Sequence, residues 1–120
     1  MTAPLIGLKL LVIEDNYLIA SLLKQILISA GCIVSEPIPE LLQAQDAARY
    51  GDYDAVVLDI NLNGVHVYPV SDILSDRNIP HLFLSGYSHQ NIPIKYSGRP
   101  KLGKPFRREQ LLDAVSSLVS

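Results

Sequence analysis

Mainly apolar runs alternate along the chain with segments whose apolar residues recur every three or four positions. Four such runs span residues 8–13, 32–35, 54–59 and 81–85, each bounded by polar or turn-forming residues. Short, continuous apolar runs are typical of strands that are covered on both faces, as in a parallel sheet. A fifth short strand is predicted at residues 101–103.

The segments between the strands predict helices. Asn16 is a suitable N-cap for the first helix, and Gly31 ends it. The apolar positions expected to form its buried stripe are Leu18, Ile19, Leu22, Leu23, Ile26 and Leu27. A second helix is predicted over residues 39–50, with one face made of Leu41, Leu42, Gln45 and Ala48. Further helices begin near Pro69 and after Pro105. The alternation of strands and helices predicts a three-layer α/β sandwich around a parallel sheet.

The stretch between the fourth and fifth strands differs from the other connections. It contains Pro93, Gly98 and Pro100 and has little periodicity, so we interpret it mostly as loop. Pro93 would remove a hydrogen bond from a helix interior, and Ile92 before it is pushed toward extended geometry. Ile92, Ile94 and Tyr96 have the spacing of an extended strip. We therefore expect residues 88–98 to form at most one helical turn, so that the fourth helix is short or absent, and to be the most mobile part of the domain.

Composition narrows the class of protein. A chain of 120 residues with 48% hydrophobic content fits a single domain over residues 1–120. The net charge is −2 and the basic residues are scattered, so direct nucleic-acid binding is not expected. Apolar runs are too short to span a membrane and no signal-peptide pattern is present, which favours a cytoplasmic location without membrane contact. Cys32 is the only cysteine, so we expect a small buried thiol and no internal disulfide.

Polar residues gather where the predicted strands end. Glu14 and Asp15 follow the first strand, Asp59 ends the third, Ser85 ends the fourth, and Lys104 follows the fifth. In open parallel sheets the ligand site lies outside the carboxyl ends of the strands, at the point where the strand order reverses. The five side chains are therefore expected to converge on one site.

The residue types at this site indicate phosphoryl transfer. Three crowded carboxylates repel one another, and a divalent cation removes the conflict. Oxygen-only ligands favour Mg²⁺, which commonly binds one or two carboxylates together with a phosphate. Asp59 can act as a nucleophile that forms an acyl phosphate, while Mg²⁺ and the ammonium of Lys104 neutralise charge on the transferred group. Ser85 can donate a hydrogen bond to the product.

Four motifs in this order, "VIEDN", "LDIN", "LFLSG" and "KPF", resemble the receiver domains of bacterial two-component response regulators, the CheY-like family. The resemblance covers essentially the whole chain. It implies a five-stranded parallel sheet in the flavodoxin-like order 2-1-3-4-5. It also implies that Asp59 accepts a phosphoryl group and that Asp15, Asp59 and the backbone carbonyl of Asn61 bind Mg²⁺. Glu14 would act through a metal-bound water.

The same resemblance assigns Ser85 as the hydroxyl switch and Lys104 as the lysine that precedes a proline. It implies a phosphoacceptor in two-component signal transduction that switches a partner-binding surface and catalyses only its own phosphorylation and dephosphorylation. The phosphoryl group would come from a histidine kinase or pass to a histidine phosphotransfer protein. With no output domain, the effect would be exerted through a protein partner, and a weak homodimer is a further expectation.

A finer resemblance is to the FAT-GUY subgroup of receivers, carried by "LDINLNG", by the Tyr68-Pro69-Val70 start of a helix and by "FLSGY". Such receivers are similar to stand-alone partners of HWE-type histidine kinases. One position departs from ordinary receivers, which have an aromatic residue three positions before the lysine where this chain has Lys101. We expect Tyr87 to take over part of that role.

Three other functions share some of these sequence features. The stretch "GRPKLGKP" has the spacing of a phosphate-binding loop, but Pro105 replaces the serine or threonine that would hold Mg²⁺. A haloacid-dehalogenase-type phosphatase would have a second aspartate where this chain has Asn61. The third alternative is a flavodoxin-like interaction module that works without phosphorylation. The histidines, at positions 66, 81 and 89, lack ligand spacing and are expected in loops or at the surface.

Overall fold

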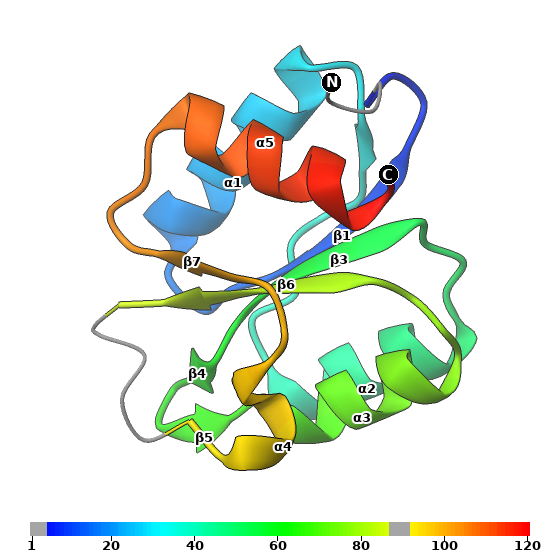
Figure 1. Cartoon of the computed structure of the whole chain (residues 1–120), viewed down its shortest axis with the longest axis vertical. Coiled ribbons are helices and arrows are strands. Elements are labelled where there is room, and N and C mark those ends of the chain that lie inside the picture. The colour runs from blue at the N-terminus through cyan, green and yellow to red at the C-terminus, as the bar shows by residue number, and fades with distance from the viewer. Residues whose placement is uncertain (1–4, 87–91) are drawn as a thin grey trace.

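A parallel sheet forms the centre of the molecule (Figure 1). The computed structural model describes residues 5–86 and 92–120. Within these residues the sheet has five strands, which lie side by side in the order β2 (Ile33–Val34), β1 (Lys9–Ile13), β3 (Ala55–Asp59), β6 (His81–Ser85) and β7 (Lys101–Gly103). All four pairings are parallel. Counting only the strands of this sheet, the order is 2-1-3-4-5, which confirms the predicted topology.

Helices cover both faces of the sheet. Helices α1 (Tyr17–Ser29) and α5 (Arg108–Leu118) lie on one face, while α2 (Leu41–Tyr50), α3 (Tyr68–Asp76) and the short α4 (Ile94–Ser97) lie on the other (Figure 1). Because side chains alternate along a strand, Leu10 and Val12 of β1 enter the apolar cluster under α1 and α5, whereas Leu11 and Ile13 enter the cluster under α2 and α3. The three-layer α/β sandwich is thus confirmed.

Helix α1 begins where the sequence predicts, but fewer of its apolar residues are buried than predicted. The Asn16 side chain accepts a hydrogen bond from the Ile19 amide at 3.1 Å. Leu23 is fully buried against the sheet, whereas Leu18 is 77% exposed and Leu22 is 46% exposed. The expected six-residue stripe was therefore wrong for these two leucines, since it is wider than the face that a helix can turn toward a sheet. They form a separate apolar ridge at the surface.

The chain before α2 is extended where a helix was predicted. Helix α2 begins at Leu41, two residues after the predicted start at Pro39. Ile38 instead bridges to Ile13 of β1, which prolongs the pairing at this side of β1. The predicted buried face of α2 also needs correction, because Leu42 is 75% exposed and Ala44 takes its place in the core.

The chain that follows β3 forms a small hairpin. Strands β4 (Asn61–Leu62) and β5 (Val65–His66) pair antiparallel around Asn63 and Gly64. Both turn residues have positive φ, 52° and 84°, as a two-residue hairpin turn of the primed type requires. Strands of two residues leave too little pattern to be recognised in the sequence.

The histidine predictions are correct for one residue and wrong for another. His66 is exposed on β5. His81 is only 2% exposed, which contradicts the expected surface position. Its Nδ1 lies 3.0 Å from the Ile79 carbonyl oxygen and its Nε2 lies 2.7 Å from the Ser71 hydroxyl, so both ring nitrogens have partners and the ring can be buried. His89 and Tyr87 lie outside the described residues.

Within the described residues, the predictions of a buried Cys32 and of a short fourth helix are confirmed. Cys32 is buried, with its thiol 3.5 Å from the Leu5 carbonyl oxygen. Between Ile92 and Gly98 the only helix is the single turn of α4, while residues 88–91 of the predicted loop lie outside the described part. The expected extended strip was wrong. In an extended segment Ile94 and Tyr96 would lie on the same face, whereas Ile94 is exposed and Tyr96 is buried. Among the described residues, no helix has the length and apolar character needed to cross a membrane.

Candidate functional site

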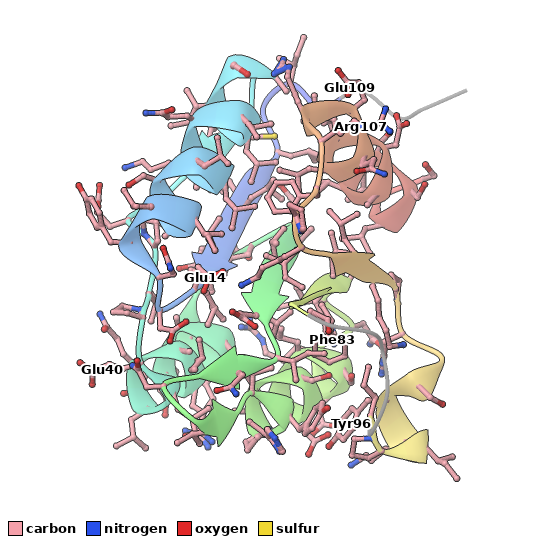
Figure 2. All side chains as sticks on the ribbon, turned by 90° about the vertical axis from the view of Figure 1, so that its left-hand side faces the viewer. Glu14, Glu40, Phe83, Tyr96, Arg107 and Glu109 are labelled. Atoms are coloured by element: carbon pink, nitrogen blue, oxygen red, sulfur yellow. The ribbon has the colours of Figure 1, made fainter. Side chains whose placement is uncertain are left out.

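The acidic residues converge at the carboxyl ends of β1 and β3, which are neighbours in the sheet. Glu14 follows β1 directly, Asp15 comes next, and Asp59 is the last residue of β3. One carboxylate oxygen from each lies within 4.8 Å of the other two. The Glu14 side chain is fully buried, whereas Asp15 is partly accessible. Figure 2 shows Glu14 at the tip of its strand.

Lys104 joins two of these carboxylates. Its Nζ donates to Glu14 Oε1 at 2.8 Å and to Asp59 Oδ2 at 2.7 Å. The residue follows β7, and its backbone amide donates to the Ser85 carbonyl oxygen at 2.7 Å. The lysine side chain is only 16% exposed, so the ion pairs are largely shielded from water. A cation from a distant part of the chain therefore offsets the repulsion between Glu14 and Asp59.

Burial and hydrogen bonding shift the pKa values of Glu14 and Asp15 in opposite directions. Burial raises the pKa of Glu14 to about 7, although the hydrogen bond from Lys104 lowers it in part and the neighbouring Asp59 raises it further. Burial alone would raise the pKa of Asp15, but hydrogen bonds with Glu14 and with the Asn63 amide bring it below its ordinary value. Burial likewise opposes the charge of Lys104, yet its contacts with Asp59 and Glu14 leave its pKa raised. The chain thus holds one acid that takes up a proton near neutrality beside one that stays ionised.

The β4–β5 hairpin closes one side of the site. The Asn61 amide donates to Asp59 Oδ1 at 3.1 Å, and the Asn63 amide donates to Asp15 Oδ2 at 3.0 Å. The Asn61 side chain accepts a hydrogen bond from the Gly64 amide at 2.7 Å and so fixes the turn. Two of the three carboxylates are therefore oriented by backbone amides of the segment that follows β3.

Ser85 is the last of the side chains that were predicted to converge at this edge of the sheet. It is the last residue of β6 and pairs in register with Gly103 of β7, one residue before Lys104. On the other side of β6, Leu84 pairs with Asp59. The structure thus brings Glu14, Asp15, Asp59, Ser85 and Lys104 to one edge, with Asn61 beside them; their chemical roles remain predictions.

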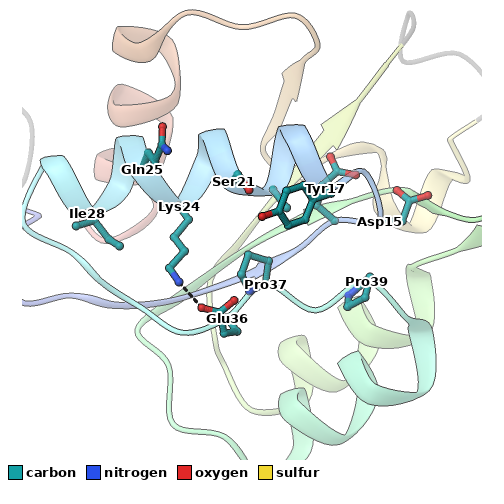
Figure 3. Close-up of a pocket in the computed structure, with 11 residues that line it drawn as sticks. Asp15, Tyr17, Ser21, Lys24, Gln25, Ile28, Glu36, Pro37 and Pro39 are labelled. Atoms are coloured by element: carbon teal, nitrogen blue, oxygen red, sulfur yellow. Dashed lines mark hydrogen bonds and ion pairs between the residues drawn. The ribbon is translucent and has the colours of Figure 1, made fainter.

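Two cavities border the acidic edge and were not anticipated. One, of about 660 Å³, lies between α1 and the extended chain before α2, with Asp15 and Tyr17 at the same end and the ion pair between Lys24 and Glu36 across it (Figure 3). The other, of about 290 Å³, is lined by Ile19, Leu22, Lys104, Pro105 and Phe106. The sequence did contain one indication of this second cavity, because α1 has more apolar positions than one helix face can bury.

The donor set fits a hard divalent cation. The three carboxyl groups of the cluster, on Glu14, Asp15 and Asp59, offer only oxygen ligands. The single ammonium of Lys104 cannot balance all three of them when they are ionised. Cysteine and histidine are absent from the cluster of metal-ligating groups in the described residues. These are the properties of a Mg²⁺ site.

Comparison with known proteins places the chain in a family. The family model described as response regulator receiver domain matches residues 10–116. The chain belongs to this receiver family. A comparison with curated proteins found no match.

Solved receiver structures superimpose closely on this domain. The receiver domain of the sensor histidine kinase PA1611 from Pseudomonas aeruginosa PAO1, solved with a magnesium ion in its active site cleft, has a TM-score of 0.83 at 24% identity, covering 94% of this chain and 98% of that one. SdrG from Sphingomonas melonis Fr1 has a TM-score of 0.84 at 29% identity, covering 97% and 98%. The BeF3-activated conformation of SdrG from Pseudomonas melonis Fr1 has a TM-score of 0.81 at 30% identity, covering 100% of both chains. The similarity to the PA1611 domain supports the fold alone.

Proposed function

We propose that this receiver domain accepts a phosphoryl group on Asp59 from a phosphohistidine, in a reaction that depends on Mg²⁺. The observation that carries the proposal is the position of Lys104, whose Nζ lies within hydrogen-bond distance of both Asp59 and Glu14. A structural ion pair would need one carboxylate, whereas three carboxylates and one lysine leave room for a second cation. Membership of the receiver family and the similarity to SdrG, which has been solved in a BeF3-activated conformation, support this reading.

The proposed reaction uses groups that the structure has already oriented. The Asp59 oxygen would bond to phosphorus as the phosphorus–nitrogen bond of the donor breaks, and the bonding electron pair would pass to the imidazole nitrogen. Lys104 would then contact a phosphoryl oxygen, and Ser85 would donate a hydrogen bond to another. Asp15, Asp59 and the Asn61 carbonyl would hold Mg²⁺, with Glu14 acting through a bound water; the ion would neutralise charge on the transferred group.

The surface around the site suits a helical donor. Tyr17 and Leu18 of α1 are 81% and 77% exposed, and Leu22 borders the apolar cavity beside Lys104. An exposed apolar ridge next to a groove fits the apolar face of a partner helix. We assign this surface to a histidine kinase or a histidine phosphotransfer protein.

Two finer assignments extend the proposal. The sequences "LDINLNG" and "FLSGY" support the FAT-GUY subgroup and hence an HWE-type kinase as the donor. The same resemblance supports a receiver that acts through a separate protein partner. In this proposal the domain catalyses only its own phosphorylation and dephosphorylation.

Labelling with acetyl phosphate tests the function. Incubated with acetyl phosphate and Mg²⁺, the wild-type chain should gain the mass of one phosphoryl group, and peptide mapping should place it on Asp59. Asp59→Asn should abolish the gain. Asp52→Asn, which alters an exposed carboxylate shortly before β3, is the matched control and should label normally. Absence of label in the wild type, or label that persists in Asp59→Asn, would contradict the proposal and favour an interaction module that works without phosphorylation.

A further inference from the structure

Three aromatic rings from separate segments meet on the α3 side of the sheet. Tyr68 and Tyr96 stack with ring centroids 4.3 Å apart and an interplanar angle of 9°. The fully buried Phe83 meets both of them edge-on, at 6.0 Å from Tyr68 and 6.4 Å from Tyr96. Figure 2 labels Phe83 and Tyr96 in this part of the molecule. Ring pairs in such arrangements stabilise one another beyond their buried area.

Two of the three rings belong to segments that carry a residue of the acidic site or lead from one, and the third belongs to α4. Tyr68 opens α3 directly after the hairpin whose Asn61 amide binds Asp59. Phe83 lies on β6, two residues before Ser85. Tyr96 is the inward-facing residue of α4. The cluster therefore connects α4 to two of the segments that build the site.

Polar contacts fix the same tyrosine to α3. The Tyr96 hydroxyl donates to Asp72 Oδ1 at 2.8 Å, and Lys95 Nζ lies 3.1 Å from the same oxygen. One turn further along α3, Ser75 accepts a hydrogen bond from Arg99 at 2.5 Å. These contacts join α3 to α4 and to the residues just after it, and Tyr96 supplies the most buried of the hydrogen bonds.

Strand β7, which leads to Lys104, holds the other end of α4. Lys101, the first residue of β7, donates through Nζ to the carbonyl oxygens of Ser97 at 2.6 Å and Arg99 at 2.8 Å. Strand β7 leads directly to Lys104. The lysine thus binds one carbonyl group of the last residue of α4 and another just after the helix.

A helix of four residues cannot hold its own conformation in water. Its place is set by what it touches, and in α4 the only buried side chain is Tyr96. A change in the hairpin, in β6 or in β7 therefore reaches α4 mainly through the rings around Tyr96 and through Lys101.

We propose that Tyr96 is a positioning residue that couples the acidic site to the α3–α4 surface, with Asp72 as the acceptor that holds it in place. The signal carried to a partner would be the release or tightening of α4 on α3. Tyr96 touches none of the reacting groups, so it affects what the phosphorylated domain presents to a partner and not the transfer itself. This inference rests on the proposed phosphoacceptor function, but the coupling can also be driven by Mg²⁺ binding alone.

Hydrogen–deuterium exchange of residues 92–101 tests the coupling, measured without addition, with Mg²⁺, and with Mg²⁺ plus acetyl phosphate. In the wild type, exchange in this segment should change when the site is filled. In Tyr96→Leu, which keeps apolar bulk but loses the ring stack and the hydroxyl, exchange should be faster by about tenfold or more and independent of the site. Labelling of Asp59 should stay close to the wild-type rate.

Conservative variants separate a specific contact from general loss of structure. Tyr96→Phe keeps the stack and loses only the hydrogen bond, so it should restore part of the response. Asp72→Ala should behave like Tyr96→Phe, while Asp76→Ala on the same helix and Tyr50→Phe on α2, both exposed, should behave like the wild type.

The outcomes distinguish this inference from the proposed function. If every variant labels but Tyr96→Leu responds as the wild type does, the coupling role is wrong and the phosphoacceptor function stands. If no chain labels, yet Mg²⁺ changes exchange in the wild type and not in Tyr96→Leu, the function is wrong and the coupling stands. If neither addition changes exchange in the wild-type segment, the coupling is overturned.

Discussion

Lys104 has one role in the free site, where it neutralises two carboxylates, and we expect a second role during phosphoryl transfer. Its ammonium is held between Glu14 and Asp59 in a largely buried position, so its removal would leave two acids facing each other. A cation can take over that neutralising role at the carboxylates, but not the contact with a phosphoryl oxygen. The residue should therefore matter more for transfer than for metal binding.

For Lys104→Ala we expect the rate of Asp59 labelling to fall by at least about tenfold, since a hydrogen bond to a charged group is worth about 1.5–3 kcal/mol. Mg²⁺ affinity at pH 8 should not fall, because the lost ammonium repels the ion. Labelling kinetics and calorimetric Mg²⁺ titration measure the two effects, with Lys9→Ala, exposed on β1, as the control. Equal losses of labelling and of metal affinity would contradict the assigned role.

The buried acid Glu14 predicts that metal binding depends on pH near neutrality. Burial raises the pKa of Glu14 to about 7, so the folded chain takes up a proton there as the pH falls through that value. Proton and cation then compete, and Mg²⁺ affinity should fall by up to about tenfold per pH unit below 7 while staying level above pH 8. Glu14→Gln should bind Mg²⁺ more weakly at pH 8 and lose this dependence. An unchanged slope in that variant would show that another group is responsible.

At the scale of the elements, the periodicity of apolar residues was enough to predict the strands and where they end. It was not enough to predict which helix residues are buried, because that depends on the neighbouring elements. The carboxyl ends of the strands were located because an apolar run that stops at Asp59 or Ser85 marks the sheet edge. The outward ridge of α1 was not located, because an apolar position such as Leu18 has the same pattern whether it meets the sheet or a partner. The inward position of Tyr96 was missed for a related reason, since its burial depends on Asp72 and Phe83 and not on its own segment.

The buried His81 shows how a local exception can pass unnoticed. A histidine at the start of β6 has the sequence signature of a strand end, but the Ser71 hydroxyl on α3 and the Ile79 carbonyl satisfy its ring. Burial lowers the pKa of His81 below its ordinary value of 6.5. The unfolded chain therefore binds a proton at this residue at a higher pH than the folded chain does.

This difference predicts that His81 lowers the stability on acidification. As the pH falls below about 6.5, His81 binds a proton in the unfolded chain but stays neutral in the folded chain. Its contribution to the free energy of unfolding should therefore decrease as the pH is lowered. Glu14, whose pKa is raised to about 7, acts in the opposite direction in both proteins, so the His81 contribution is the difference between them. In urea titrations between pH 8 and pH 5, His81→Gln should gain stability relative to the wild type as the pH falls. His66→Gln, at an exposed position, should keep the wild-type dependence. Parallel curves for the wild type and His81→Gln would refute the assignment.

At the scale of the whole molecule, the acidic site exists only in the folded chain. Lys104 lies 90 positions after Glu14 and 45 after Asp59, and Asn63, which orients Asp15, lies 48 positions after it. An unfolded chain cannot hold these groups together, so an ion that binds the site binds only the native state. Such a ligand stabilises the fold by mass action, by about 2.7 kcal/mol at a hundred times its dissociation constant.

Mg²⁺ should therefore raise the thermal midpoint in proportion to the logarithm of its concentration once this exceeds the dissociation constant, by several degrees for a domain of this size. Asp15→Ala should abolish the increase, because the accessible carboxylate that meets the ion is gone, whereas Asp52→Asn should keep it. The measurement is differential scanning calorimetry at pH 8 with ionic strength held constant by NaCl, so that screening alone cannot move the midpoint. An increase that persists in Asp15→Ala would place the ion elsewhere on the surface. A wild-type midpoint that stays constant up to tens of millimolar Mg²⁺, a range that covers weak protein sites, would reject the metal site altogether.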